Sequence, residues 1–447
     1  NDTITFDTVF ASIGSITKTL TVYNRNNYDV KSNIGIEGYS SAHFRMNIDG
    51  IPIPVNERKN IEIPAKDSIF IFLEVTIDPS DNNTPYVLTD SIVFTTGTIK
   101  QDVDLVAWGQ DAYFHTVDTF GVFFNQNGDS IPFYYHILEN STTWTNEKPH
   151  VIYGYIFINP GQTLTINPGC NIYLHKNSGI IVGNPFSPYL GGTIKINGEL
   201  GNEVTLQGDR LDSWYRDVPG QWDRILMSPG SVNNEINYAI IRNGNIGIQA
   251  DSIGEVEINN TVIENMAGIG ILGQEATITA NNTVISKCGL YSVACNKGGA
   301  YNFTHCTFAN YWDYSKRNTP SILLKNWYEG ADGYIYHRDL KEANFTNCII
   351  DGSLSTEVSF QENEEKEFNY VFNHCLIKLD PDEDTENSHY VNSIINQAVN
   401  FEDAYEDDFH LTEESPAIDA GNISTAGTTD IEGNTRNNSP DIGAYEF

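Results

Sequence analysis

The stretch that decides the fold is a phrase repeated in the middle of the chain: EVEINNTVIEN at 255–265, TITANNTVISK at 277–287 and AYNFTHCTFAN at 300–310. In each copy an apolar residue is followed three positions later by Thr or Cys, and two positions after that by Ile or Phe. Ile258, Thr261 and Ile263 form one such set. A repeat of this length, with alternating apolar residues and no helical period, predicts a coil built of β-strands.

The template occurs in six segments, and its middle residue lies at 239, 261, 283, 306, 348 and 375. The spacings are 22, 22, 23, 42 and 27 residues, and the longest is about two turns of the coil. Two strands per turn predict a parallel β-helix, in which equivalent residues stack at about 4.8 Å. We expect Cys306, Cys348 and Cys375 to share one internal column and to fill it as free thiols.

Short strands and turns continue the coil on both sides of the template. Asn-Pro-Gly turns at 159–161 and 167–169 separate strands that repeat at eight residues. We therefore expect the β-helix at 151–410, a connector and amino-terminal cap at 113–150, and a carboxy-terminal cap at 411–447.

Residues 1–112 read as a separate domain of short alternating strands. Its central strand at 68–78 carries aliphatic residues on one face and Phe70 and Phe72 on the other. The pattern predicts a β-sandwich. The strands around Phe6, Val22 and Val93 resemble those of immunoglobulin-like accessory domains of secreted bacterial proteins.

The coil resembles right-handed β-helix proteins of the pectate-lyase-like superfamily found on bacterial surfaces. The resemblance rests on GQTLTINPG at 161–169, Gly198, Trp222 and a carboxy-terminal signature made of SPAIDAG at 415–421, DIEGNTR at 430–436 and DIGAYE at 441–446. It implies an all-β fold with an N-terminal immunoglobulin-like β-sandwich followed by a right-handed parallel β-helix. In the signature, we expect Arg436 to form a buried ion pair between Asp430 and Asp441 that fixes the last loop over the open end of the coil.

Charge and composition exclude several classes of function. Against 25 Lys and Arg stand 59 Asp and Glu, a net charge of −34, which disfavours nucleic acid and anionic membranes as partners. No apolar run reaches the ~18 residues of a transmembrane segment. The chain starts at Asn1 without a leader, so we expect a secreted or cell-surface protein whose signal segment is missing from this sequence.

Aromatic and basic residues gather at 311–339, which we interpret as a carbohydrate-binding surface. Sugar rings stack on aromatic faces, and basic side chains bind hydroxyl or carboxylate groups. The candidate ligand-binding residues are Trp312, Tyr314, Arg317, Trp327 and Tyr336. Packing of this aromatic turn against the coil is the alternative.

The sequence contains fewer residues that indicate catalysis or metal binding than residues that indicate carbohydrate binding. Lys325, His337 and Arg338 are of the types that a polysaccharide lyase uses to neutralise a uronate and remove its proton. The Gly-His-Gly motif of polygalacturonase-type hydrolases is absent. Asp380, Asp382 and Asp384 mimic a calcium loop, but Thr385 stands where the loop needs Gly. We expect no metal site and no cofactor, with calcium as the one candidate ion.

The leading hypothesis is a non-enzymatic, exported β-helix protein that binds carbohydrate or serves in adhesion, its oligomeric state left open. A polysaccharide lyase or glycoside hydrolase that uses the surface at 311–339 is the first alternative. A purely structural rod without a ligand is the second.

Overall fold

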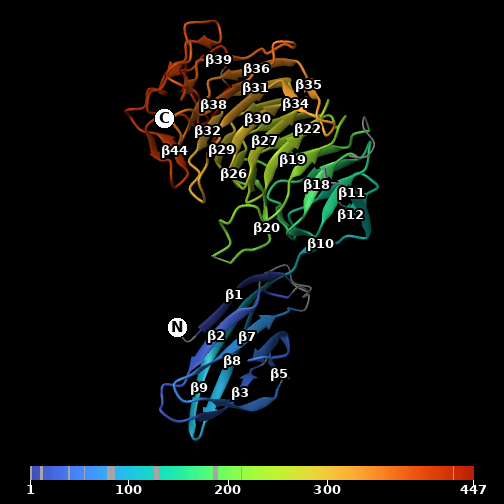
Figure 1. The fold of residues 1–447 in the computed structure, drawn as a ribbon, viewed down its shortest axis with the longest axis vertical. Coiled ribbons are helices and arrows are strands. Elements are labelled where there is room, and N and C mark those ends of the chain that lie inside the picture. Colours follow the sequence, from blue (N-terminus) through green and yellow to red (C-terminus); the bar gives the residue numbers. More distant parts are fainter. Residues whose placement is uncertain are drawn as a thin grey trace. The chain divides into compact units, whose positions relative to one another are not determined.

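The computed structural model describes residues 3–10, 14–38, 41–54, 56–77, 86–124, 130–184, 190–212, 214–425 and 427–447. The chain divides into two compact units. Unit 1 comprises 1–113 and 211–216, and unit 2 comprises 114–210 and 217–447. Figure 1 draws unit 1 in blue and the stacked strands of unit 2 from green to red.

Unit 1 consists of two sheets that enclose one apolar core. Ile34, Ile71, Leu73 and Leu105 are fully buried in it. The five-stranded sheet has the order β1 (Thr3–Phe10), β9 (Ile99–Gln110), β8 (Tyr86–Thr96), β3 (Val30–Glu37), β6 (Arg58–Ile63). The four-stranded sheet has the order β2 (Lys18–Tyr23), β7 (Ser68–Val75), β4 (Phe44–Ile48), β5 (Ile51–Ile53), and a 3-10 turn, η1 (Ser41–His43), precedes β4.

Unit 2 is a parallel β-helix with three strands per turn, where the sequence predicted two. Each turn passes through a first, a second and a third sheet, and its strands pair in parallel with their counterparts one turn later, except that the first strand of the first sheet, at 119–124, pairs antiparallel with the next one. The first sheet contains β11 (Thr119–Phe124), β12 (Ser130–Leu138), β15 (Tyr155–Ile158), β18 (Gly179–Val182), β21 (Ile225–Met227), β24 (Ile246–Ala250), β27 (Ile269–Gln274), β30 (Tyr291–Asn296), β33 (Ile322–Lys325) and β38 (Val358–Gln361). The second contains β13 (Thr142–Trp144), β16 (Thr163–Ile166), β19 (Thr193–Asn197), β22 (Asn234–Asn237), β25 (Glu255–Asn259), β28 (Thr277–Asn281), β31 (Gly299–Thr304), β36 (Leu340–Thr346), β39 (Val371–Asn373) and β41 (Tyr390–Val391). The third contains β10 (Tyr113–His115), β14 (His150–Ile152), β17 (Asn171–Leu174), β20 (Val204–Gly208), β23 (Ala239–Arg242), β26 (Val262–Met266), β29 (Val284–Cys288), β32 (Thr307–Asn310), β37 (Ile349–Gly352), β40 (Leu376–Ile377) and β42 (Ile394–Ile395).

The coil begins earlier than the sequence predicted. Residues 113–150, which we expected to be a connector and cap, form β10 to β14, and β12, β13 and β14 make the first complete turn. An aromatic residue on the outside of the sheet conceals the alternation: Tyr135 of β12 stacks on Phe157 of the next strand, β15, with ring centroids 4.6 Å apart.

The interior of the coil is filled by in-register columns. Phe303, Phe345 and Phe372 stack at 4.9 Å intervals. All six cysteines are free and buried, which agrees with the predicted role of Cys306, Cys348 and Cys375 as internal filler.

A column of left-handed residues connects the second sheet to the third. Asn260, Asn282, His305, Asn347 and His374 have φ angles of 48°, 45°, 49°, 54° and 52°. Asn adopts this conformation more readily than most residues because its short amide bonds locally. Adjacent amides also bond to each other, as from Asn282 Nδ2 to Asn260 Oδ1 at 3.0 Å.

The carboxy-terminal segment, residues 399–447, packs along the side of the coil. This differs from the predicted cap at 411–447 over its open end. Val284, Ala309, Ile349 and Leu376 point outward from the third sheet, and apolar residues of the segment cover them: Val399, Phe409, Leu411, Ala417, Ile431, Ile442 and Ala444. The segment includes the hairpin β43 (Phe401–Asp403) and β44 (Asp408–Leu411). Covering an outward apolar stripe explains why it lies there.

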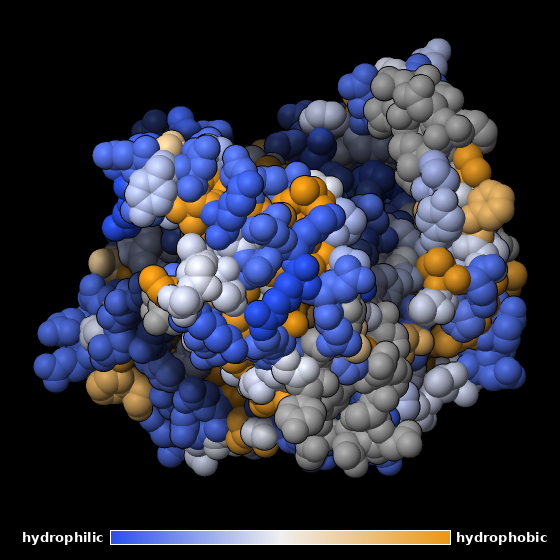
Figure 2. Space-filling view, turned by 90° about the horizontal axis from the view of Figure 1, so that it is seen from below, coloured by the Kyte–Doolittle hydropathy of each residue, from blue (hydrophilic) through white to orange (hydrophobic). Residues whose placement is uncertain are grey.

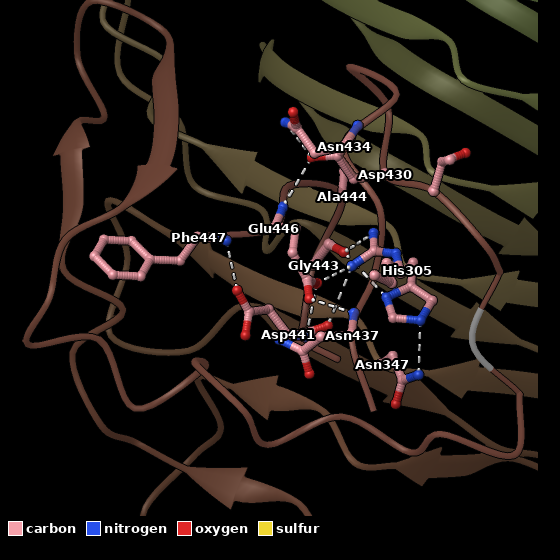
Figure 3. A network of polar contacts seen from close by, with 12 residues as sticks. His305, Asn347, Asp430, Asn434, Asn437, Asp441, Gly443, Ala444, Glu446 and Phe447 are labelled. Atoms are coloured by element: carbon pink, nitrogen blue, oxygen red, sulfur yellow. Dashed lines mark hydrogen bonds and ion pairs between the residues drawn. The ribbon is translucent and has the colours of Figure 1, made fainter. Parts of the chain in front are cut away.

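Arg436 anchors this segment through Glu446 and Gly443, which Figure 3 shows close to Asp441. Its guanidinium pairs with Glu446 at 3.0 Å, and both side chains are buried. The predicted partners Asp430 and Asp441 instead accept backbone N–H bonds from Glu446 and Phe447, at 3.0 and 2.6 Å.

On the face drawn in Figure 2, hydrophilic side chains prevail and hydrophobic ones form separate small patches, in keeping with the net charge of −34. Within the described residues, no helix has the length and hydrophobicity to span a membrane.

Candidate functional site

A short hairpin stands out from the coil between β33 and β36. It consists of β34 (Trp327–Glu329) and β35 (Ile335–His337). Tyr328 and Tyr336 are cross-strand partners whose rings stack with centroids 5.3 Å apart at 20°. Asp332 in the hairpin turn accepts the Tyr336 hydroxyl at 2.6 Å, which fixes that ring.

Two cations lie against the tyrosine pair. Lys297 Nζ is 4.7 Å from the centroid of the Tyr328 ring, and Arg338 donates to the Tyr328 hydroxyl at 3.2 Å. Arg338 Nε also pairs with Glu275 at 3.2 Å, and Glu275 accepts from the Ser252 hydroxyl at 3.1 Å. These contacts tie the hairpin to the turns that follow β24, β27 and β30.

The next cross-strand pair, Trp327 and His337, points to the opposite face of the hairpin. Lys325 Nζ lies 3.9 Å from the centroid of the Trp327 ring, and partial burial lowers the pKa of Lys325. His337 pairs with Glu365 at 2.8 Å. Of the three basic residues considered for catalysis, His337 and Arg338 both line the cleft described next, and Lys325 is not among its lining residues.

A cleft of about 460 Å³ opens where the hairpin meets the second sheet. Its lining carries hydrogen-bonding groups of both charges with few apolar side chains, and includes Glu255, Glu275, Thr277, Arg338, Lys341 and Lys366. Closely spaced donors and acceptors of this kind suit a ligand with many hydroxyl groups.

A row of polar residues follows the carboxyl ends of the first-sheet strands. We call Asp251, Gln274, Asn296, Lys325 and Gln361 the end row; Gln274 is in register with Asn296, and Lys325 with Gln361. The sequence analysis missed it because its members are 22 to 36 residues apart and differ in type. The sequence signal that could have revealed the end row is the regular spacing of the strands that precede its members.

Asp251 is the acidic residue of the end row, and two glutamine amides bind its carboxylate. Its Oδ1 accepts amide bonds from Gln249 at 2.8 Å and Gln274 at 2.9 Å. Gln249 in turn accepts from Arg224 at 2.6 Å. Burial raises the pKa of Asp251 despite the nearby Lys297. A carboxyl group with a raised pKa beside cations can give or take a proton.

The remaining predicted binding residues lie elsewhere, and two of them are not at the surface. Arg317 is buried in an ion pair with Glu357 at 2.6 Å, with side-chain exposures of 1% and 0%. Trp312 is 7% exposed and donates to Ser315. Tyr314 is exposed. All three precede β33, at its amino end, whereas the hairpin follows its carboxyl end, so 311–339 does not form one surface.

No metal site was found among the described residues, because no group of three or more His, Cys, Asp or Glu side chains is placed to hold an ion. Asp380 and Asp384 accept backbone N–H groups of their own loop, from Asp382 at 3.0 Å and Glu386 at 3.1 Å. Calcium therefore stays a prediction to be tested by adding it.

No protein-family model and no curated protein matches the chain. Among solved structures, the A-module of a mannuronan C-5 epimerase from Azotobacter vinelandii aligns with 59% of this chain and 89% of its own, at 13% identity and a TM-score of 0.25. The catalytic unit of a GH87 α-1,3-glucanase from Streptomyces thermodiastaticus covers 80% of this chain and 66% of its own, at 10% identity and a TM-score of 0.23. A family 123 glycoside hydrolase from Clostridium perfringens covers 25% of this chain and 26% of its own, at 10% identity and a TM-score of 0.19. At these TM-scores the interpretation of the site rests on its own side chains.

Proposed function

We propose that this protein binds a carbohydrate chain at the hairpin and in the cleft beside it. One observation carries the proposal: Arg338, which donates to the hydroxyl of Tyr328 in the stacked Tyr328–Tyr336 pair, also lines a 460 Å³ cleft whose other lining groups are mainly hydrogen-bonding. Aromatic rings supply apolar contact with sugar C–H faces, and charged and hydroxyl groups select the sugar by its hydroxyls. With this function we propose an exported or cell-surface protein, composed of an immunoglobulin-like domain and a right-handed parallel β-helix.

The test is a glycan array with the full chain, run with and without calcium. We expect binding that Tyr336→Ala reduces at least tenfold. Tyr314→Ala is the matched control, because Tyr314 is also an exposed tyrosine but lies at the other end of β33. Equal loss in both variants would reject this site, and no binding to any glycan would reject it and favour the structural rod.

Cleavage of the bound glycan is a second candidate function, favoured by the Asp251 geometry. A carboxyl group with a raised pKa, held by two amides and close to Lys297, has the properties of a proton donor for glycosidic bond cleavage. Mass spectrometry of eluted glycans detects it: a hydrolase adds water, and a lyase leaves an unsaturated sugar. Asp251→Asn should then stop cleavage and keep binding. If all eluted glycans are intact, cleavage is rejected and carbohydrate binding is the remaining function.

A further inference from the structure

Unit 1 contains a groove that the proposed carbohydrate site does not use. It has a volume of about 730 Å³ and lies between β2, at the edge of the four-stranded sheet, and the inner face of the five-stranded sheet. Its floor is apolar and belongs to the margin of the core, with Leu20, Val22 and Val103 only partly buried. The remaining aliphatic and phenylalanine residues of the lining are Val30, Ile63, Phe94 and Ile99.

Strand β2 presents a free backbone edge to this groove. Among the described strands it pairs only with β7. Asn24 N–H donates to Asp67 O at 2.9 Å, so in an antiparallel ladder the even-numbered residues of β2 bond to β7. The N–H and C=O groups of Thr19, Thr21 and Tyr23 therefore point away from β7, as the unpaired groups of an edge strand do.

A buried hydroxyl in the groove also lacks a partner. Ser32 lies on the inner face of β3, is 2% exposed, and its Oγ makes no hydrogen bond to any described residue. A buried polar group left unpaired is destabilising, and a ligand that supplied the missing bond would remove that cost.

Two cations and one carboxylate lie at the end of the groove beside Tyr23, and Asp102 is also among the residues that line the groove. An adjoining hollow of about 390 Å³ is lined by Tyr23, Asn24, Arg25, Lys66 and Asp67. The Lys66 ammonium donates to the backbone O of Arg25 at 2.7 Å, and the Asp67 carboxylate accepts the backbone N–H of Ser68 at 2.8 Å. In a chain of net charge −34, two cations at this end favour a carboxylate in the occupant.

We propose that this groove binds a β-strand of a separate polypeptide, added to the edge of β2. The bound strand would form main-chain hydrogen bonds with the free edge of β2 and place apolar side chains on the groove floor at alternate positions. A carboxylate of the bound strand would pair with Arg25 and Lys66 at the Tyr23 end. Unit 1 is then a protein-docking domain, and this function is independent of carbohydrate binding by unit 2.

The probes are two synthetic peptides of alternating valine and threonine, one with two aspartates at its amino end and one with them at its carboxyl end. We expect one of them to slow hydrogen exchange of the Thr19, Thr21 and Tyr23 amides at least tenfold in the full chain. Two lysines in place of the aspartates should weaken binding. Unchanged exchange at these amides with both peptides would overturn the proposal.

A pair of variants tests the edge directly. Thr21→Pro removes one outward N–H and leaves the β7 pairing intact, so it should weaken peptide binding at least tenfold. Thr21→Val keeps the N–H and should bind like the parent. Equal affinities in the two variants would contradict strand addition, and the exchange experiment on the parent stands even if Thr21→Pro fails to fold.

Discussion

Replacing His305 by Asn should make the coil more resistant to acid. His305 is 1% exposed beneath the carboxy-terminal segment, where its Nδ1 meets the Gly443 carbonyl at 3.2 Å and its Nε2 meets Asn347 at 2.9 Å. Burial, with the nearby Arg436 charge, lowers the pKa of His305 to about 3. Asn occupies the same left-handed position at 260, 282 and 347, so the substitution keeps the backbone conformation.

The magnitude follows from proton linkage. An unfolded His titrates near 6.5, so above that pH both states are neutral and His305 contributes no pH dependence. Between about pH 6.5 and 3, His305 is protonated in the unfolded state and neutral in the folded state, so the free energy of unfolding falls as the pH falls. The loss is about 2 kcal/mol at pH 5 and about 3 kcal/mol at pH 4 relative to pH 8.

The assay is urea unfolding of parent and variant at pH 8, 6, 5 and 4, with the difference in unfolding free energy plotted against pH. Taking the difference cancels the many carboxylates that both proteins share. His305→Asn should gain about 2 kcal/mol on the parent between pH 8 and pH 5. His374→Asn is the control, because His374 occupies the same column but is only half-buried, and it should gain less. Parallel pH profiles for parent and His305→Asn would refute the linkage argument.

Three further results are expected. Arg317→Ala should cost about 3 to 5 kcal/mol in unfolding free energy, because it leaves Glu357 buried without its cation, whereas removal of the exposed Arg45 of the Arg45–Glu74 pair should cost less than about 1 kcal/mol. All six thiols should resist a thiol reagent in the folded chain and react in urea, since burial raises the pKa of Cys288 to about 12 and that of Cys348 as well; rapid labelling of the folded chain would count against the buried column. Gly273→Ala should lower the melting temperature, because its Cβ would lie 2.3 Å from the ring of Tyr301; an unchanged melting temperature would mean that the ring can move aside.

The repeat was readable because the interior of a coil demands the same kind of residue at the same place in every turn. Ile258, Ala280 and Phe303 follow one another along one column, and the sequence shows them 22 and 23 residues apart. The first turn was not predicted, since Tyr135 packs on the outside of the sheet against Phe157 and breaks the alternation of apolar and polar residues.

The site was harder to predict for a different reason. Residues 311–339 are continuous in sequence, but four residues of β33 separate Trp312 and Arg317 from the hairpin. Asp251 reaches the same region from three turns away through strand register, and a single sequence gives no measure of that register until the strands are placed.

Each of the three sheets gains one strand per turn, so equivalent residues along a sheet are evenly spaced. Successive members of the end row lie one inter-strand spacing, about 4.8 Å, apart, as for Asp251, Gln274, Asn296 and Lys325. Duplicating one turn between β27 and β30 would increase the distance of Asp251 from Lys297 and the hairpin by one inter-strand spacing. The neighbours of each residue within its own turn would stay the same. Removing a turn would do the reverse. Distances within such a surface change in whole steps, by the gain or loss of about 22 residues, and not by gradual shifts of the backbone.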